Sequence, residues 1–193
     1  FNDGDPVSKW NDLSGSGKHG VQAVADEKPV YNTQGFNGKT TISFDGVKDS
    51  LKLTNRKLLG SSYTAFLIAE SNDNDGIFLS QYTTSSTGRM GLNIYNNKLR
   101  VWTGGGQKES DEDFANGTPF LMTARNNNKS LDVWGNGGVS SNNGPVSIST
   151  DAPDIDNYVG KQLHPDDSYS GAFKGKISEI IIFNSALSDD QVT

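Results

Sequence analysis

The stretch MGLNIYNNKLRVWTG, residues 90–104, carries the pattern that decides the fold. Apolar and polar residues alternate on both sides of the pair Asn96-Asn97, and this pattern predicts two strands joined by a tight hairpin turn. The predicted strands are Leu92–Tyr95 and Leu99–Thr103. Successive side chains of a strand point to opposite faces of a sheet, so we expect this hairpin to bury one face and expose the other.

Similar runs of strand length recur along the chain, separated by turns rich in Gly, Asn and Ser. They lie at residues 40–46, 50–55, 63–70, 76–82, 120–125, 131–134, 157–161 and 173–182. Only LSDDQVT, Leu187–Thr193, reads as a helix start, with Ser188 at the N-cap and Gln191 as its capping-box partner. Many short strands without crossover helices predict an all-β fold, an antiparallel sandwich or barrel. The polar segments 107–117 and 135–144 are predicted to be long surface loops.

Length and charge limit the possible functions. The 193 residues fit one domain, residues 1–193, with a substantial core. The 17 basic residues are scattered among 23 acidic ones and give a net charge of -6, which argues against nucleic acid as a partner because phosphate binding needs clustered Lys and Arg. No apolar run approaches the length of a membrane span, so we expect no membrane insertion. The chain has no cysteine and therefore no disulfide framework.

A set of landmarks follows in a fixed order: WNDLSGSGKHG (10–20), TTISFDG (40–46), YTAFLIAE (63–70), LDVWGNG (131–137) and FKGKISEIIIFNSALSDDQ (173–191). This order resembles the laminin-G-like, concanavalin A-like domains of bacterial surface proteins, phage structural proteins and modular carbohydrate-active enzymes. The resemblance covers nearly the whole chain and implies an antiparallel two-sheet jelly-roll β-sandwich. Both ends are shorter than is common in this group, so we expect a domain excised from a larger polypeptide. The expected location is extracellular, secreted, cell-surface or virion-associated, with the other domains of the parent polypeptide as partners.

Catalysis is the first functional hypothesis to test, because this fold group includes glycoside hydrolases and polysaccharide lyases. Retaining glycosidases need two carboxylates about 5 Å apart. Glu109, Asp111 and Asp113 alternate in ESDED, but the intervening Ser110 and Glu112 are polar, which favours a solvated acidic loop. The Arg, Gln-x-His and Tyr-Lys-Gly-Tyr segments that the resemblance associates with lyases are absent.

The loop WNDLSGSGKHG, residues 10–20, contains the other arrangement that resembles a catalytic site. His19 follows Ser14 and Ser16, but residues adjacent in one loop rarely have the geometry of a triad, and His164 also lies in a polar segment. We therefore expect surface histidines, a core-anchoring Trp10 and glycines that permit positive φ. The chain is predicted not to be an enzyme.

Calcium is the one cofactor that the sequence suggests, because it prefers carboxylate and carbonyl oxygens from loops. The preferred ligands are Asp12, Asp45 and Asp49, since their loops flank landmark strands and the resembling group commonly has calcium sites at its rim. The alternative is that Asp is simply a good turn residue, with Asp12 capping its own turn.

Sugar binding in such modules rests on aromatic rings that stack on sugar faces, helped by polar side chains. The candidate ligand-binding residues are Tyr82, Arg89, Trp102, Asn127, Trp134 and Tyr169. The alternative is that the three tryptophans are core residues, because Trp is mostly buried. The sequence predicts a non-catalytic carbohydrate-recognition or adhesion module that binds a glycan or surface polysaccharide. The second hypothesis is a structural or decoration domain with protein partners and no sugar binding, and the third is a jelly-roll hydrolase or lyase.

Overall fold

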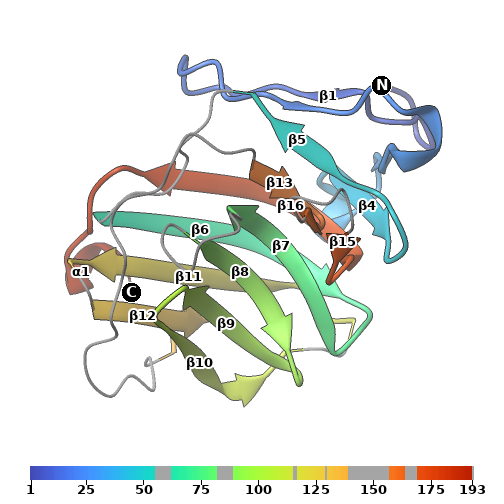
Figure 1. Ribbon diagram of the computed structural model, residues 1–193. Coiled ribbons are helices and arrows are strands. Elements are labelled where there is room, and N and C mark those ends of the chain that lie inside the picture. The colour runs from blue at the N-terminus through green and yellow to red at the C-terminus, as the bar shows by residue number, and fades with distance from the viewer. Residues whose placement is uncertain are drawn as a thin grey trace.

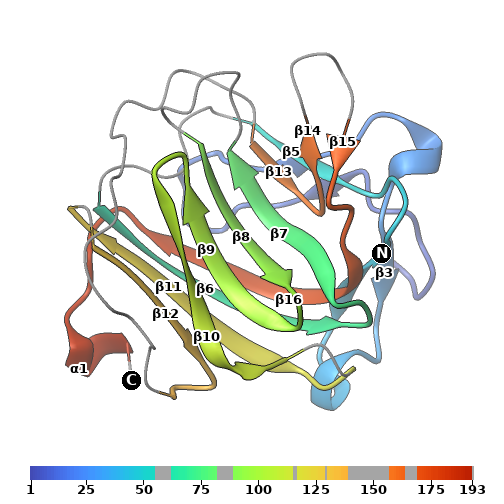
Figure 2. The same cartoon turned by 60° about the horizontal axis from the view of Figure 1, so that its bottom comes forward.

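A computed structural model describes residues 1–54, 62–81, 89–114, 117–128, 130–138, 157–163 and 169–192, with the backbone alone at positions 163 and 169. Two antiparallel sheets pack face to face and enclose the core between them (Figures 1 and 2). The predicted two-sheet β-sandwich is confirmed.

The larger sheet has eight strands. Their spatial order is β1 (Lys9–Trp10), β2 (Gly20–Val21), β5 (Leu51–Leu53), β13 (Asn157–Val159), β7 (Asp75–Gln81), β8 (Met90–Tyr95), β9 (Lys98–Thr103) and β10 (Gly106–Asp113).

The second sheet has six strands. Their order is β12 (Ser130–Gly135), β11 (Phe120–Asn127), β6 (Ser62–Ser71), β16 (Lys174–Phe183), β4 (Thr41–Asp45) and β3 (Val30–Asn32). A small third sheet pairs β14 (Gln162–Leu163) with β15 (Tyr169–Ser170).

Helical structure in the described residues is confined to single turns. These are the 3-10 turns η1 (Ala25–Glu27) and η2 (Phe36–Gly38) and the helix α1 (Asp189–Val192). The backbone N–H of Ser188 donates to Oε1 of Gln191 at 3.0 Å, so the predicted capping contact at α1 is confirmed.

The hairpin of β8 and β9 shows why the sequence folds in this way locally. Asn96 and Asn97 both have positive φ, 48° and 69°, which a two-residue turn of this hand requires and which asparagine tolerates better than most residues. Leu99 and Val101 are fully buried, whereas Lys98, Arg100 and Trp102 alternate with them on the opposite face. The hairpin therefore has one buried face and one outer face, as predicted.

Aromatic rings fill the centre of the sandwich. Phe78 on β7 is fully buried, and its ring centroid lies 4.9 Å from that of Phe173 and 5.9 Å from that of Phe120. Ile177 on β16 belongs to the same core, and the partly buried Trp10 packs against that core. These contacts join residues from both sheets, so they hold the two layers together.

The glycines of the loop after Trp10 have two different roles. Gly15 and Gly17 have the predicted positive φ, 82° and 69°. Gly20 is not among the positive-φ residues, and the expectation for it was wrong. A Cβ at Gly20 would lie 3.2 Å from the Cβ of Leu51, so this glycine allows a close approach between β2 and β5.

The acidic segment that was predicted to be a loop is a strand. Residues 106–113 form β10, which pairs with β9 at the edge of the eight-stranded sheet. Ser110 is its inward residue, and its hydroxyl accepts the backbone N–H of Leu99 at 3.0 Å. An edge strand has only one neighbour, and charged residues there discourage pairing with other chains. The second predicted loop, 135–144, lies mostly outside the described residues.

Candidate functional site

One row of paired residues crosses all eight strands of the larger sheet. In spatial order it contains Lys9, Val21, Lys52, Tyr158, Ser80, Gly91, Trp102 and Gln107. Their chain neighbours Leu51, Leu79 and Val101 belong to the core, so this row lies on the outer face. Ser80 is 1% exposed and Gly91 has no side chain, so the accessible part of this row near Trp102 is formed by Trp102 and Gln107 at the β9–β10 end.

Trp102 lies directly over Gly91 in this row. A Cβ built on Gly91 would come within 2.3 Å of the indole ring, so the ring rests on the bare backbone of β8. Trp102 is half-buried and is not part of the core cluster. A glycine inside a strand often marks such a close approach, and it leaves an aromatic ring held on the outer face.

Arg100 is held beside Trp102 by two contacts. Its guanidinium carbon lies 3.8 Å from the centre of the Tyr95 ring, and its Nε donates to Oδ1 of Asn93 at 3.1 Å. Asn93 is 1% exposed, and its own amide donates to the carbonyl of Ile94 at 3.1 Å. The stacked ring and the buried amide therefore fix the orientation of the guanidinium.

Two carboxylates balance the charge of Arg100. Glu109 on β10 pairs with it in register, and Asp75 is the other carboxylate that attracts it. Burial lowers the pKa of Arg100, although the nearby carboxylates of Glu109 and Asp75 act in the opposite direction. Burial likewise raises the pKa of Asp75, against the attraction of Arg100. Gln107 donates its amide to Oε1 of Glu109 at 3.2 Å, which adds a polar contact on the Trp102 side.

The predicted ligand-binding residues do not all lie on this face. Trp102 does, and Arg89 immediately precedes β8, where its carbonyl accepts the backbone N–H of Gly104 at 3.2 Å. Asn127 and Trp134 belong to the six-stranded sheet instead. Tyr82 and the side chain of Tyr169 lie outside the described residues. Arg100 was not predicted as a site residue from the sequence, although it lies two residues before Trp102 and therefore on the same face of a strand.

Trp134 occupies the outer face of the six-stranded sheet, at the opposite side of the sandwich. It is 7% exposed, and the guanidinium carbon of Arg125 lies 4.9 Å from the centre of its ring. Arg125 also pairs with Asp132 at 2.9 Å and with Asp189 at 2.7 Å. This arrangement covers Trp134 and links α1 to the sheet.

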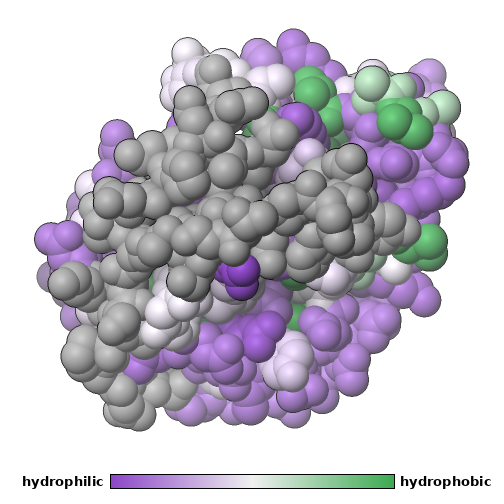
Figure 3. All heavy atoms as spheres, in the orientation of Figure 1, coloured by the Kyte–Doolittle hydropathy of each residue, from purple (hydrophilic) through white to green (hydrophobic). Residues whose placement is uncertain are grey.

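The same outer face carries an apolar patch next to Trp134. Phe66, Ile68, Leu121 and Ile181 line a shallow depression together with Glu179. Ile181 and Phe183 are each 42% exposed. In the view of Figure 3, by contrast, the described surface is mostly hydrophilic and its apolar residues are scattered. Large exposed apolar side chains that gather on one sheet are typical of a contact surface.

The three predicted calcium ligands lie in two backbone turns, one that contains Asp12 and one that contains both Asp45 and Asp49. Asp12 accepts the backbone N–H groups of Ser14 at 2.8 Å and Lys18 at 2.9 Å, and its own N–H donates to Nδ1 of His19 at 3.0 Å. The Ser14 side chain and these N–H groups lower the pKa of Asp12 to about 2. Asp12 therefore caps its own turn, which was the alternative expectation. The contacts of His19 and Ser14 are those of a turn and not of a triad.

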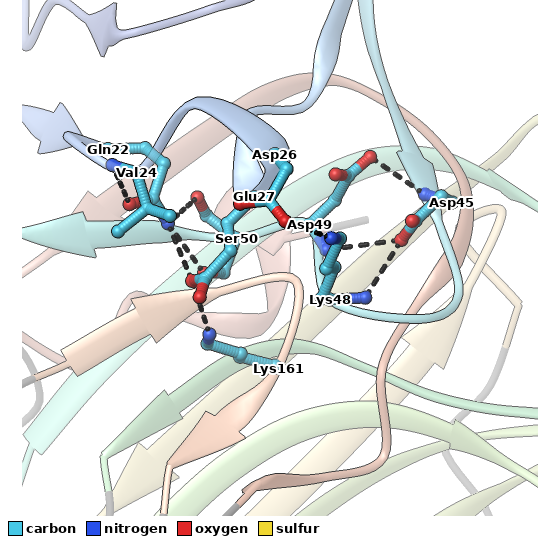
Figure 4. Close-up of polar contacts among 9 residues, drawn as sticks. All are labelled: Gln22, Val24, Asp26, Glu27, Asp45, Lys48, Asp49, Ser50 and Lys161. Carbon is cyan, nitrogen blue, oxygen red and sulfur yellow. Dashed lines mark hydrogen bonds and ion pairs between the residues drawn. The ribbon is translucent and has the colours of Figure 1, made fainter. Parts of the chain in front are cut away.

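Asp45 and Asp49 face each other across one tight turn (Figure 4). Asp45 accepts the N–H groups of Val47, Lys48 and Asp49, and Asp49 accepts the N–H of Asp45 at 3.0 Å. Within the described ranges, no three carboxylate or histidine side chains gather closely enough to hold a metal ion. The described residues thus do not unite Asp12 with Asp45 and Asp49, and calcium binding stays a prediction.

A buried lysine ties the neighbouring N-terminal segment to the large sheet (Figure 4). Lys161, 5% exposed, donates to Oε2 of Glu27 at 3.1 Å, and the amide of Gln22 donates to the same carboxylate and to the carbonyl of Ser50, each at 3.2 Å. Lys48 pairs with Asp26 at the rim. These carboxylates are engaged in contacts that hold η1 against the sheet.

The turn of Asp45 and Asp49 predicts a pH-dependent stability. Burial and the nearby Asp45 carboxylate raise the pKa of Asp49 to about 6. A folded-state pKa above the unfolded one means that this group destabilises the fold as the pH rises from about 4 to 6.

We expect Asp49→Asn to raise the free energy of unfolding by about 1–3 kcal/mol at pH 7, with no gain below about pH 4. Denaturant unfolding at both pH values measures this difference. A variant less stable at pH 7 would instead show that ionised Asp49 has a favourable partner, such as a cation.

The ESDED carboxylates lie along the edge strand β10. Asp111 and Asp113 are exposed, and Asp113 pairs with Lys98 at 3.2 Å. Glu109 is the member that borders Trp102 and Arg100, through its register with Arg100. The strand therefore contributes one carboxylate to the candidate site.

Comparisons with known proteins show the fold but no close relative. No family model matches the sequence, and no curated protein matches it. Domain 4 of AbnA, an extracellular GH43 arabinanase from Geobacillus stearothermophilus, solved with arabinotriose, is 18% identical with a TM-score of 0.62, over 86% of this chain and 79% of that one. The CBM40 of the Ruminococcus gnavus IT-sialidase, bound to sialyllactose, is 13% identical with a TM-score of 0.59, over 79% of this chain and 93% of that one.

A third likeness is to mouse laminin α1 domains LG4-5, 14% identical with a TM-score of 0.60, over 89% of this chain and 46% of that one. Together with the two-sheet topology, these likenesses define the class: the fold is that of a laminin-G-like, concanavalin A-like β-sandwich domain. Among the described residues, no helix has the length and apolar character that crossing a membrane would require.

Proposed function

We propose that this domain is a non-catalytic carbohydrate-recognition module that binds a glycan on the outer face of the eight-stranded sheet. The observation that carries the proposal is the half-buried indole of Trp102, which rests on Gly91 beside the fixed guanidinium of Arg100. Aromatic rings stack on the apolar faces of sugars, and a few oriented polar groups bind their hydroxyls. Two fold relatives, solved with arabinotriose and sialyllactose, support a glycan as the partner.

The non-catalytic part of the proposal rests on the acidic strand. Of the three ESDED carboxylates, Asp111 and Asp113 are exposed at a sheet edge and Glu109 borders the aromatic face, whereas Asp75, the other carboxylate that attracts Arg100, lies on β7, three strands away from β10. A glycosidase needs two carboxylates that flank one bond. We expect neither reducing ends nor unsaturated products when the protein is incubated with a polysaccharide that it binds, and either product would contradict this part.

A screen of polysaccharides tests the proposal. The protein is applied to a glycan array and to polysaccharide gels, with calcium and with a chelator. We expect binding to at least one glycan, and absence of binding to all of them would contradict the proposed function. A loss of binding in chelator, together with heat released on calcium titration, would support calcium-assisted binding. An extracellular or surface location is part of the same proposal and is supported by the extracellular arabinanase domain among the fold relatives.

A second candidate function is a structural or decoration domain with protein partners. The apolar patch of Phe66, Ile68, Leu121 and Ile181 on the six-stranded sheet, with the exposed Phe183 on the same face, favours this function. This function predicts that Ile181→Lys abolishes association with a neighbouring domain or a second copy, measured by sedimentation, without lowering the melting temperature. Glycan binding with a monomeric protein would favour the first function.

A further inference from the structure

We propose that the subsite formed by Trp102 and Arg100 selects neutral sugars over sugars that carry a carboxylate. The inference rests on the proposed function and adds the chemical class of the ligand. It follows from the charges that surround Arg100, because an isolated guanidinium would favour an anionic sugar.

Arg100 presents unused donors at a fixed position. Its Nε is bonded to Asn93 and its flat face is covered by Tyr95. Within the part of the chain that the structure describes, neither Nη atom of Arg100 has a hydrogen-bond partner. The two Nη groups therefore keep N–H donors available to a ligand, on a residue that lies on the same strand face as Trp102.

The charge of Arg100 is already balanced. Glu109 lies directly opposite it on β10, and Asp75 attracts it from the β7 side. Arg89, at the start of β8, already has an interaction partner. The four described groups Arg89, Arg100, Glu109 and Asp75 sum to zero formal charge, so the described part of the subsite has no excess positive charge to attract an anion.

Among the residues that the structure describes, the other basic side chains near the subsite are paired, point to the other face or lie far away. Lys98 is paired with Asp113. Lys108 pairs in register with the core residue Val101, so it points to the other face of the sheet. Lys52 belongs to the same row as Trp102 but lies four strands away, about 19 Å at the usual strand spacing and beyond the Debye length of about 8 Å at physiological salt.

A pair of sugar hydroxyls suits this set of groups. A hydroxyl both donates and accepts, so one can accept from an Nη of Arg100 and another can donate to the carboxylate of Glu109. A sugar carboxylate can only accept, and it would lie against Glu109. The same groups that satisfy a neutral sugar thus repel an acidic one.

The test is an array of neutral and acidic polysaccharides at equal density, including polygalacturonan with its carboxylates methyl-esterified or free. We expect the wild-type protein to bind neutral members at least about tenfold more tightly than acidic ones, with little change between low and high salt. Glu109→Gln removes the repelling charge and should lower the ratio of neutral-sugar to acidic-sugar affinity by about tenfold. Asp113→Asn, the same charge change on the same strand, is the matched control and should leave the ratio unchanged.

Each outcome separates this inference from the function on which it rests. Preferential binding of acidic members that is lost at high salt and in Arg100→Gln would overturn the inference and leave glycan binding established. If Glu109→Gln had the same ratio of neutral-sugar to acidic-sugar affinity as the wild type, that result would also overturn the inference. No binding to any member would overturn the proposed function itself.

Discussion

Replacing Phe78 by alanine is expected to lower the free energy of unfolding by about 3–5 kcal/mol. Phe78 is fully buried between the sheets, and its ring contacts Phe173 and Phe120 at centroid distances of 4.9 and 5.9 Å. Removing the ring takes away buried apolar area and leaves a cavity that close-packed neighbours cannot fill. Urea unfolding followed by tryptophan fluorescence measures the change.

Phe183→Ala is the matched control for this result. Phe183 is 42% exposed on the outer face of β16 and contacts Phe66 edge-on at a centroid distance of 6.1 Å. Much of its ring is already in water, so we expect its loss to cost about 1 kcal/mol or less. Equal losses for the two variants would contradict the account of the core between the sheets.

Gly91→Ala is expected to weaken glycan binding by at least about tenfold while leaving Trp102 in the sequence. The new methyl group would lie 2.3 Å from the indole, which must move off the backbone of β8. The stacking surface then loses its position, and the sheet hydrogen bonds are unaffected. Isothermal titration with a glycan identified by the array measures the affinity, and the melting temperature checks the fold.

Trp102→Ala should cause a similar loss, and the double variant should lose little more than either single one. Such non-additivity is expected because both substitutions disrupt the same contact. Asn127→Ala, on the six-stranded sheet, is the control and should bind as the wild type does. Wild-type affinity in Gly91→Ala would show that the ordered indole is not part of the site.

Some parts of the fold could be predicted because one local rule decides them. The hairpin of β8 and β9 is readable since Asn96-Asn97 suits a turn with two positive φ angles and apolar residues alternate on both sides. The strand β10 is not readable in this way. It lies at a sheet edge and buries Ser110 instead of a large apolar residue, so its composition resembles that of a loop.

The candidate site was predictable only in part for a related reason. Alternation places Trp102 on one face of its strand, but it does not say which sheet that strand joins. The sequence therefore predicts Trp134 and Trp102 in one site, although the two lie on different sheets. The role of Arg100 depends on Asn93 and Glu109, which only the strand pairing brings opposite it. Such cross-strand partners follow from register, which a single strand does not determine.

The most direct test of the sheet-face site is a titration followed by the indole N–H signals in a proton–nitrogen NMR spectrum. The chain has three tryptophans, Trp10, Trp102 and Trp134, so single Trp→Phe variants assign every signal. On addition of a glycan selected by the array, the account predicts that the Trp102 signal shifts and saturates while those of Trp10 and Trp134 stay in place. A saturating shift of the Trp134 signal with Trp102 unchanged would contradict it and place the ligand on the six-stranded sheet.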